Sequence, residues 1–512
     1  MARLAEVQSS ILLRIVSSNR ATEFGQQHGF NRINTVNRYR EAVPVRTYEE
    51  FWPYIQRISS PESRVLTREP TLLFEPTSGS SQATKLIPYT KTLKREFHAA
   101  INPWLVDIYS NRPGLSRGRS YWSISPPVTH SHPGETSVPI GFDADSAYLS
   151  ALSRLLVERT FVTPDSLRAE SNPAEFYRKL TLHLLAAGDL SLVSIWNPTA
   201  FLLVLDFIRD NRLDLLRFLN DSPSPVSSPT RVRDLGRLLE LDPIPFHDVW
   251  PRLRFISCWA DGPNSVYANQ LRALFPRAEV QGKGLIATEG IITIPFDGQC
   301  YLPAYQSHFL EFEPEGEAGH TVLVHELEDE GVYRVVITTS GGLYRYRLGD
   351  IVTVTGHHRG LPLIQFVARD KVLDHFGEKL NIGAVERVVN RLLSEIARTI
   401  VFVLFGFESN GTAGRYCLFV EFADGVSRDH SADLARLQSD LTAHLEANYH
   451  YMHARNLRQL EPLAVFRIAS GGLKTYHSRL LSMGMKAGDI KLETVSALED
   501  WSSWFDGNFS MS

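Results

Sequence analysis

Residues 77–85 read Thr-Ser-Gly-Ser-Ser-Gln-Ala-Thr-Lys. The stretch follows the apolar run Leu72-Leu73-Phe74, which is a strand candidate, and it ends on a lysine. Short hydroxyl side chains, backbone N–H groups and a cation are what a loop needs to hold a polyphosphate. A solvated Ser/Thr loop would have the same composition, so the function of this stretch depends on the rest of the chain.

The loop does not match the phosphate-binding loop of kinases and related ATPases. That motif requires Gly-x-x-x-x-Gly-Lys-[Ser/Thr], and here Gly79 alone precedes the lysine. A P-loop enzyme is therefore not favoured. The candidate phosphate-binding residues of the loop are Thr77, Ser78, Gly79, Ser80, Ser81 and Lys85.

The bulk composition is that of an ordinary globular protein. The chain has 512 residues, of which 43% are hydrophobic and 21% charged, with a net charge of −4. This length predicts several domains, or one large and one small domain. Without a basic excess, a nucleic-acid partner is not expected. The apolar stretches are far shorter than the ~20 residues of a membrane span, so no membrane association is expected.

The cysteines and the N-terminus bear on location. Cys258, Cys300 and Cys417 lie far apart and form neither a metal-binding spacing nor a disulfide framework. The first residues lack the apolar segment of a signal peptide. We therefore expect a cytoplasmic protein.

Strands alternate first with helices and later with other strands. Thr90 can cap a helix over residues 91–109, which Pro103 would kink or interrupt. Further helices are expected over 144–159 and 197–219, and strands over 253–259, 278–287, 320–327 and 332–338. The pattern predicts an α/β fold: a large N-terminal domain with mixed β-sheets, a β-barrel element and packed helices.

The C-terminal part reads as a separate, smaller α+β unit. Short strands alternate there with two longer helices, over a length that is normal for one domain. The charged residues at 369–371 follow the last strand of the preceding region. We place the boundary there, which gives a large domain over 1–369 and a small domain over 370–512.

Three further sites carry side chains suited to nucleotide chemistry. Thr288 and Glu289 follow a predicted strand, where Glu289 could hold Mg²⁺ because hard cations take oxygen ligands. Asp350 follows a glycine turn, and a carboxylate accepts hydrogen bonds from two ribose hydroxyls. Arg369 closes a strand just before the domain boundary. Each has a plainer explanation as a solvated or salt-bridged residue when taken alone.

In this order, the four sites resemble the adenylate-forming superfamily, which includes acyl-CoA and aryl-CoA synthetases, luciferase and adenylation domains. Residues 77–85 are similar to its phosphate loop, and Ala287-Thr288-Glu289 to its Thr-Glu motif. Residues 346–350 resemble the ribose-binding aspartate motif and residues 369–380 the hinge motif.

The closest resemblance is to the plant auxin-responsive acyl acid amido synthetases and their bacterial relatives, over residues 40 to 495. The stretches that carry it are Phe-Glu-Pro-Thr-Ser-Gly-Ser-Ser from 74, Ser-Ile-Trp-Asn-Pro-Thr from 194, Ile-Ser-Cys-Trp-Ala-Asp-Gly from 256, Lys-Gly-Leu-Ile-Ala-Thr-Glu-Gly from 283, residues 344–350, and Gly-Asp-Ile-Lys from 488.

The resemblance implies an ATP- and Mg²⁺-dependent ligase. A small carboxylic acid is adenylated to acyl-AMP with release of pyrophosphate, and an amine or amino acid then displaces AMP to form an amide. The loop and Lys85 would hold the β- and γ-phosphates. Thr288 and Glu289 would contact the α-phosphate and the metal, and Ala287 would contact the nucleotide. Asp350 would bind the ribose hydroxyls, with Arg369 close to the ribose or a phosphate. The adenine or acid pocket would be lined by Trp259, Asp261 and Gly262.

The superfamily's catalytic lysine lies near the C-terminus of a mobile small domain. Lys486 and Lys491 both fit, and Lys491 is favoured because it follows Gly488-Asp489-Ile490. Transfer to CoA or to a carrier protein is an alternative outcome of the same adenylation. A catalytically inactive nucleotide-binding homologue is a second alternative, because Ala83-Thr84 departs from the family's loop. A monomer or weak dimer is expected.

Overall fold

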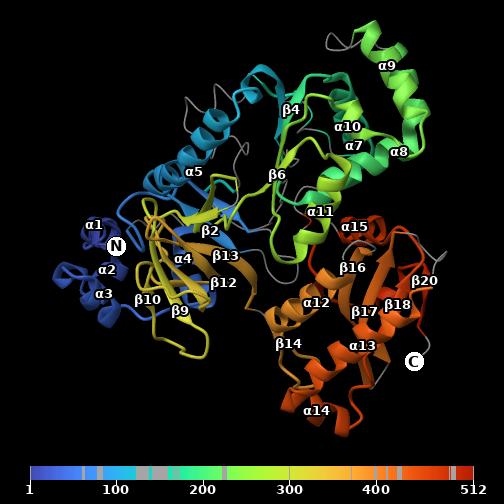
Figure 1. Cartoon of the computed structure of the whole chain (residues 1–512). Helices are drawn as coiled ribbons and strands as arrows, with labels where there is room; N and C mark the ends of the chain where they lie inside the picture. Colours follow the sequence, from blue (N-terminus) through green and yellow to red (C-terminus); the bar gives the residue numbers. More distant parts are fainter. Residues whose placement is uncertain are drawn as a thin grey trace.

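The computed structural model shows two lobes (Figure 1). It describes residues 2–59, 64–77, 85–122, 138–140, 160–164, 167, 170, 172–221, 228–298, 300–370, 372–396, 400–410, 413–423, 429–483, 485, 490 and 492–510. The expected helix over 144–159 lies outside these residues.

The first lobe contains an antiparallel sheet in the order β10-β9-β11-β12-β13. Its strands are β9 (Phe309–Pro314), β10 (Val322–Leu323), β11 (Val332–Thr338), β12 (Tyr346–His358) and β13 (Leu361–Arg369). The hairpin of β7 (Thr293–Phe296) and β8 (Cys300–Pro303) lies beside β13. These strands lie where the sequence predicted a β-barrel element, and they form a five-stranded antiparallel sheet with an adjoining hairpin.

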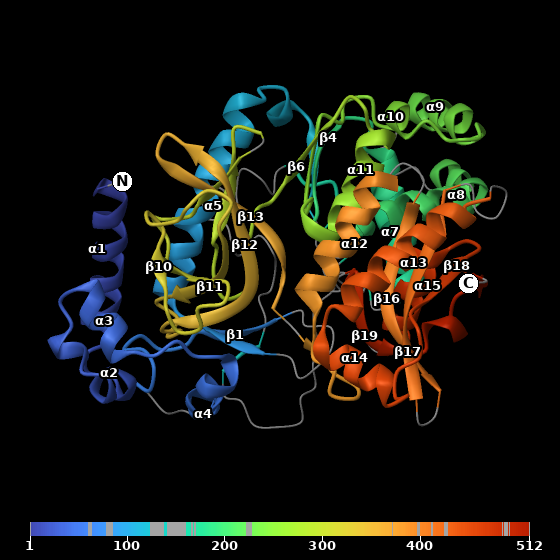
Figure 2. The ribbon, with the colours of Figure 1, turned by 60° about the horizontal axis from the view of Figure 1, so that its bottom comes forward.

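Helices from the N-terminus lie beside this sheet (Figures 1 and 2). Gln8 fixes the first of them, because its amide nitrogen donates to the carbonyl of His308 at 2.8 Å and its amide oxygen accepts from the N–H of Leu310. The four helices are α1 (Ala2–Ser18), α2 (Glu23–Gln27), α3 (Val36–Ala42) and α4 (Tyr48–Ser59).

A parallel sheet in the order β3-β4-β5-β6 forms the middle of the molecule. Its strands are β3 (Arg119–Trp122), β4 (Leu190–Ser194), β5 (Phe255–Cys258) and β6 (Glu279–Gly282). The helices around it are α5 (Lys91–Asn111), α7 (Pro173–Ala186), α8 (Pro198–Asp221), α9 (Pro229–Leu239), α10 (Phe246–Val249) and α11 (Ser265–Leu274).

The helices predicted over 91–109 and 197–219 are confirmed by α5 and α8. The strands predicted over 278–287 and 320–327 are too long, and the second is only the two-residue β10. Thr90 caps α5 by accepting from the N–H of Leu93, and α5 continues through Pro103 to its end. The expected strand over 278–287 stops at Gly282. The chain turns away there because Gly284 has a φ of +72°, a conformation that favours glycine.

The second lobe is an α+β unit, as predicted. Its mixed sheet has the order β19-β16-β17-β18-β20. The strands are β16 (Ile400–Asn410), β17 (Ala413–Phe422), β18 (Ala464–Ile468), β19 (Val495–Glu499) and β20 (Gly507–Phe509). The helices are α12 (Ile382–Ile396), α13 (Ser431–Glu446), α14 (Tyr449–Asn456) and α15 (Gly472–Ser482).

A short hairpin of β14 (Val372–Leu373) and β15 (Leu380–Asn381) connects the end of β13 to α12. Glu378 stabilises its turn by accepting from the backbone N–H groups of His375 and Phe376. The second lobe also packs on α11, where the Gln270 amide donates to the Val401 carbonyl at 3.0 Å. The lobes are therefore joined by a connector and by side-chain contacts.

One buried histidine of α15 makes stability sensitive to acid. His477 is 4% exposed, neither ring nitrogen hydrogen-bonds to a described residue, and burial lowers its pKa to about 4. Between its ordinary value of 6.5 and about 4, the unfolded chain takes up a proton that the folded chain does not. Stability is therefore lost as the pH falls through this window.

We expect His477→Phe to lessen this acid destabilisation. Relative to the variant, the wild-type free energy of unfolding should fall by roughly 3 kcal/mol between pH 7 and pH 4. Urea denaturation at several pH values measures the difference, and His450→Phe, at an exposed position of α14, is the matched control. Parallel pH profiles for wild type and His477→Phe would contradict the assignment.

Candidate functional site

The predicted phosphate loop joins β1 (Leu73–Pro76) to β2 (Leu86–Tyr89), which pair antiparallel. At its base the N–H of Thr77 donates to the Lys85 carbonyl at 2.9 Å. This bond brings the first and last residues of the predicted loop together. Ser78, Gly79, Ser80 and Ser81 lie outside the described residues.

Lys85 reaches into a buried polar cluster. Its ammonium donates to the Tyr346 hydroxyl at 3.3 Å and lies 5.3 Å from the ring centre of Tyr48. The Tyr346 hydroxyl in turn donates to a carboxylate oxygen of Glu289 at 3.2 Å. Burial raises the pKa of Tyr346 well above its ordinary value, so this hydroxyl stays protonated and remains a donor.

Thr288 and Glu289 form the tip of a tight turn. The N–H groups of Ala287 and Gly290 each donate to the other residue's carbonyl, at 3.0 and 3.2 Å. The Tyr89 hydroxyl, from the end of β2, donates to the Thr288 carbonyl at 2.6 Å. The prediction that this pair directly follows a sheet strand is wrong, because the chain leaves β6 several residues earlier.

Asp350 and Arg369 are cross-strand neighbours on β12 and β13. The Arg369 guanidinium lies 3.6 Å from a carboxylate oxygen of Asp350, which is buried. The glycine before this aspartate, Gly349, does have a positive φ of +83°. It lies inside β12, so the expected turn before Asp350 is wrong. Arg369 ends its strand, as predicted.

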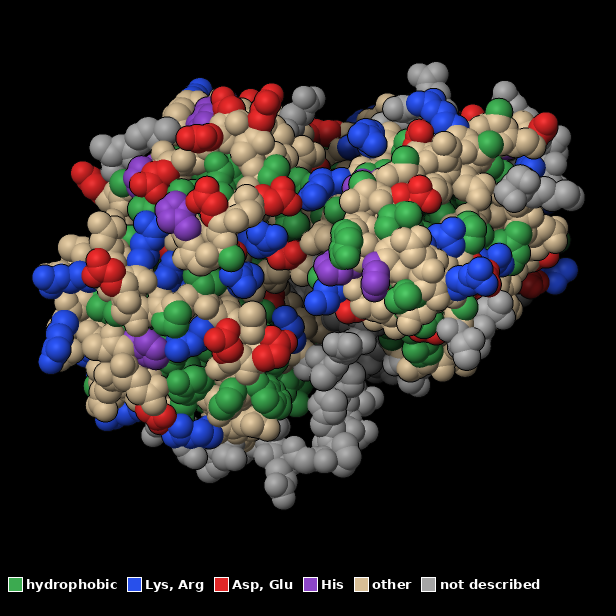
Figure 3. Space-filling view, turned by 90° about the horizontal axis from the view of Figure 1, so that it is seen from below, with side chains coloured by type: hydrophobic (Ala, Val, Ile, Leu, Met, Phe, Trp, Pro, Cys, Tyr) green, Lys and Arg blue, Asp and Glu red, His purple; other side chains and the backbone are tan. Residues whose placement is uncertain are grey.

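Arg369 also marks where the lobes meet. Burial lowers the pKa of its guanidinium, but the charges of Asp350, Glu493 and Glu289 outweigh this effect and raise it. Glu493 precedes β19 in the second lobe, whereas Asp350 and Glu289 belong to the first. The space-filling view shows a hollow between the lobes with Lys and Arg side chains on both rims (Figure 3).

The predicted pocket residues follow β5. The Trp259 ring lies 5.6 Å from that of Trp196, and the Asp261 carboxylate accepts from the Gln365 amide on β13 at 2.8 Å. Gly262 has a φ of +55°, and a Cβ there would lie 3.2 Å from a carbonyl of β13. Burial raises the pKa of Asp261, against the hydrogen bonds from Gln365 and Tyr301. These residues therefore attach the parallel sheet to the strand that ends at Arg369.

The two candidate catalytic lysines cannot be placed relative to the other predicted site residues. Lys486 and Lys491 lie outside the described residues, although Ile490 and Leu492, on either side of Lys491, are buried. Sequence reasoning also missed the roles of Tyr48, Tyr89 and Tyr346. Only the position of Tyr346 inside a quoted motif could have drawn attention to it.

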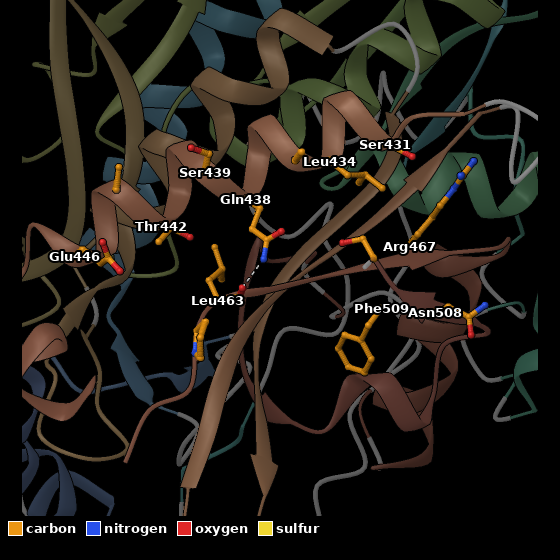
Figure 4. Close-up of a pocket in the computed structure, with 14 residues that line it drawn as sticks. Ser431, Leu434, Gln438, Ser439, Thr442, Glu446, Leu463, Arg467, Asn508 and Phe509 are labelled. Atoms are coloured by element: carbon orange, nitrogen blue, oxygen red, sulfur yellow. Dashed lines mark hydrogen bonds between the residues drawn. The ribbon is translucent and has the colours of Figure 1, made fainter. Parts of the chain in front are cut away.

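Other features of the described chain lie apart from the predicted site. No group of three or more His, Cys, Asp or Glu side chains within the described residues is arranged to hold a metal. No described helix is long and apolar enough to cross a bilayer. A groove of about 870 Å³ lies between α13 and the edge formed by β18 and β20, and none of the predicted site residues that the structure describes lines it (Figure 4).

Three domain models of one protein family match this chain in order. The GH3 family N-terminal domain matches residues 1–280, the central domain residues 301–369 and the C-terminal domain residues 383–499. The chain is 25% identical over 413 residues to the putative indole-3-acetic acid-amido synthetase GH3.10 of Oryza sativa subsp. japonica, covering 77% of this chain and 84% of that protein.

Two solved structures share the fold. AtGH3.15 acyl acid amido synthetase in complex with 2,4-DB superposes with a TM-score of 0.82 at 19% identity, covering 99% of this chain and 95% of that one. The 2-hydroxyisobutyryl-CoA ligase in the postadenylation state, in complex with 2-HIB-AMP, has a TM-score of 0.53 at 11% identity, covering 98% and 88%. The predicted fold, with mixed β-sheets and packed helices followed by a smaller α+β part, is confirmed.

We expect Glu289→Gln to stabilise the protein at neutral pH. Glu289 is 7% exposed, and burial raises its pKa above the ordinary value of 4.5, although Lys85 counteracts part of this effect. As the pH rises above that value, the unfolded chain ionises before the folded chain, so wild-type stability falls relative to the variant. Glutamine can still accept from Tyr346 and does not titrate.

Urea denaturation between pH 4 and pH 8 measures this effect. The advantage of Glu289→Gln should be absent near pH 4 and should grow as the pH rises. Glu41→Gln, at an exposed position of α3, is the control and should show no such trend. A variant less stable than wild type at pH 8 would show that the ionised carboxylate stabilises the fold.

Proposed function

The chain belongs to the GH3 family, and from this premise we propose that it is an ATP-dependent acyl acid amido synthetase, a ligase that forms C–N bonds. In the first half-reaction a carboxylate oxygen attacks the α-phosphorus of ATP and the bond to the β-phosphate breaks, releasing pyrophosphate. In the second, an amine or amino acid nitrogen attacks the acyl carbon, AMP leaves, and the nitrogen loses a proton.

The contact from Lys85 through Tyr346 to Glu289, beside Asp350 and Arg369, carries this proposal. Attack of an anion on a phosphate needs positioning and neutralisation of charge. Lys85 and the loop from Thr77 through Ser81 would hold the departing phosphates. Thr288, with Ala287, would face the α-phosphate and nucleotide.

Asp350 and Arg369 suit the ribose side of the nucleotide. The two carboxylate oxygens of Asp350 are acceptors for two neighbouring hydroxyls. Arg369 lies beside this carboxylate and is 36% exposed, so its guanidinium is accessible to a sugar or phosphate oxygen. Trp259, Asp261 and Gly262 would line the adenine or acid pocket.

The donor set fits Mg²⁺ bound together with ATP. Mg²⁺ is commonly held by one or two carboxylates plus substrate phosphates, and Glu289 offers one buried carboxylate in this cluster. When bound, the ion would neutralise phosphate charge. Glu289 would orient the ion, and the Tyr346 hydroxyl would hold Glu289 in place.

The catalytic lysine is proposed to be Lys491, with Lys486 as the alternative. Glu493 is close enough to Arg369 to influence its pKa, so the segment just after Lys491 borders the Asp350–Arg369 pair. A cation from this segment would meet the reacting carboxylate and the α-phosphate.

We propose that the mobile domain comprises residues 370–512, after a large domain of 1–369. The end of β13 at Arg369 and the short connector before α12 support this division. Rotation about it between the half-reactions would let the second lobe contribute different residues. The buried, unbridged thiols of Cys258 and Cys417 fit a cytoplasmic protein, which we propose acts as a monomer or weak dimer.

Acid-dependent exchange of labelled pyrophosphate into ATP tests the adenylation step. We expect exchange with some members of a panel of small carboxylic acids. Mass spectrometry with mixed amino acids, amines and CoA should then detect an amide. An acyl-CoA product would favour the alternative acceptor, and nucleotide binding without exchange for any acid would favour the inactive homologue.

Single replacement of the two lysines tests the catalytic assignment. Lys491→Ala should reduce pyrophosphate exchange by about a hundredfold or more, because charge stabilisation in the transition state is lost. ATP binding, followed by calorimetry, should change far less. Lys486→Ala is the matched control. Unchanged exchange in both variants would remove the assignment, and loss only in Lys486→Ala would transfer it.

A further inference from the structure

The carboxyl ends of the four parallel strands meet at one edge of the sheet. Ligands of open α/β sheets bind outside this edge. Here it carries aromatic rings: Trp122 ends β3, Trp196 follows β4 and Trp259 follows β5. Lys283 follows β6 and is the lone charged residue between positions 280 and 288.

The Lys283 ammonium lies inside this aromatic group. The residue is 3% exposed, and its ammonium donates to the Ser194 hydroxyl at 2.8 Å. It lies 4.8 Å from the ring centre of Trp104, 5.2 Å from Trp196 and 5.9 Å from Trp122. Aromatic faces attract a cation, and more strongly where water is excluded. The edge therefore offers a buried cation and flat apolar walls at the same point.

A chain of contacts connects this group to the proposed nucleotide site. Trp196 contacts Trp259, and Asp261, two residues further on, bonds Gln365. Gln365 is four residues before Arg369 on β13, roughly 13 Å along a strand. The aromatic edge and the reacting groups thus belong to one continuous region but lie at different ends of it.

On the premise of the proposed function, we propose that Lys283 is a specificity-determining residue of the acid pocket. It selects planar carboxylic acids that carry a hydrogen-bond-accepting oxygen at the end remote from the reacting carboxylate. The reacting carboxylate must approach the phosphate near Thr288, at the tip of the turn. Lys283 directly follows β6 and precedes that turn by several residues. We therefore place its ammonium at the end of the acid opposite the reacting carboxylate.

The chemistry of the lining fits this class of acid. Tryptophan rings form flat walls that favour planar apolar groups. A buried ammonium makes a charge-assisted hydrogen bond, which is stronger than a neutral one. An acid without the remote oxygen would fill the same walls but would place apolar atoms against the cation, which costs binding energy.

Matched pairs of acids test the proposal: benzoate with 4-hydroxybenzoate, phenylacetate with 4-hydroxyphenylacetate, and cinnamate with 4-hydroxycinnamate. In wild type, kcat/KM for pyrophosphate exchange should favour the hydroxylated member of at least one pair. Lys283→Met should reduce that ratio about tenfold to a hundredfold. Lys283→Arg, which keeps the cation, should retain most of it. Lys179→Met on α7 is the control and should leave the ratio as in wild type.

Calorimetric titration of the same acids measures binding without turnover and separates two failures. If no acid supports exchange but wild type binds the hydroxylated acids more tightly and Lys283→Met does not, the proposed function fails and the role of Lys283 stands. If wild type shows no preference in any pair by either method, the inference is overturned. An equal preference in wild type and in Lys283→Met also overturns the inference. If Lys283→Met does not fold, Lys283→Gln takes its place in both measurements.

Discussion

The Tyr346 hydroxyl lies between the Lys85 ammonium and the Glu289 carboxylate, and the predicted site depends on this arrangement. It joins the start of β2, the turn over 287–290 and the start of β12, which are far apart in sequence. A buried carboxylate without a partner would cost several kcal/mol, so the three groups stabilise one another only when all are in place. The Tyr89 bond to the Thr288 carbonyl fixes the same turn from a second direction.

Two hydrophobic cores flank the site. One joins the N-terminal helices, α5 and the antiparallel sheet, and it contains Tyr346. The other joins the helices around the parallel sheet to the second lobe. Arg369 lies where β13 leaves the first core, with carboxylates of both lobes acting on it. A charged, partly exposed contact is less costly to rearrange than a packed apolar one, because water can replace its partners. The polar groups therefore lie at the boundary between the two cores, where a rearrangement would cost least.

The sequence predicted what is local and missed what depends on long-range pairing. The loop residue Lys85, the Thr288-Glu289 pair, Asp350 and Arg369 each stand in a short motif. Described contacts join Lys85 to Glu289 through Tyr346, and Asp350 to Arg369. The bonds of Tyr48, Tyr89 and Tyr346 could not be predicted, because each crosses between distant segments. The strand over 278–287 was predicted too long since its apolar pattern continues after the chain has turned at Gly284. The sequence indicates a turn at Gly349 because glycine is favoured wherever φ is positive, both in turns and at an irregular position inside a strand.

The charges within this cluster are not at their electrostatic optimum. Burial raises the pKa of Glu289, and the charge of Asp350 raises it further, so ionisation of this carboxylate opposes folding. An apolar side chain in its place would avoid that cost, which indicates that the position is adapted to something other than stability. In the proposed reaction, a divalent cation and a polyphosphate would bring one positive centre to Glu289 and negative oxygens to Lys85. Glu289 and Lys85 would then each gain a partner of opposite charge, so binding of the nucleotide would relieve the cost of ionising Glu289.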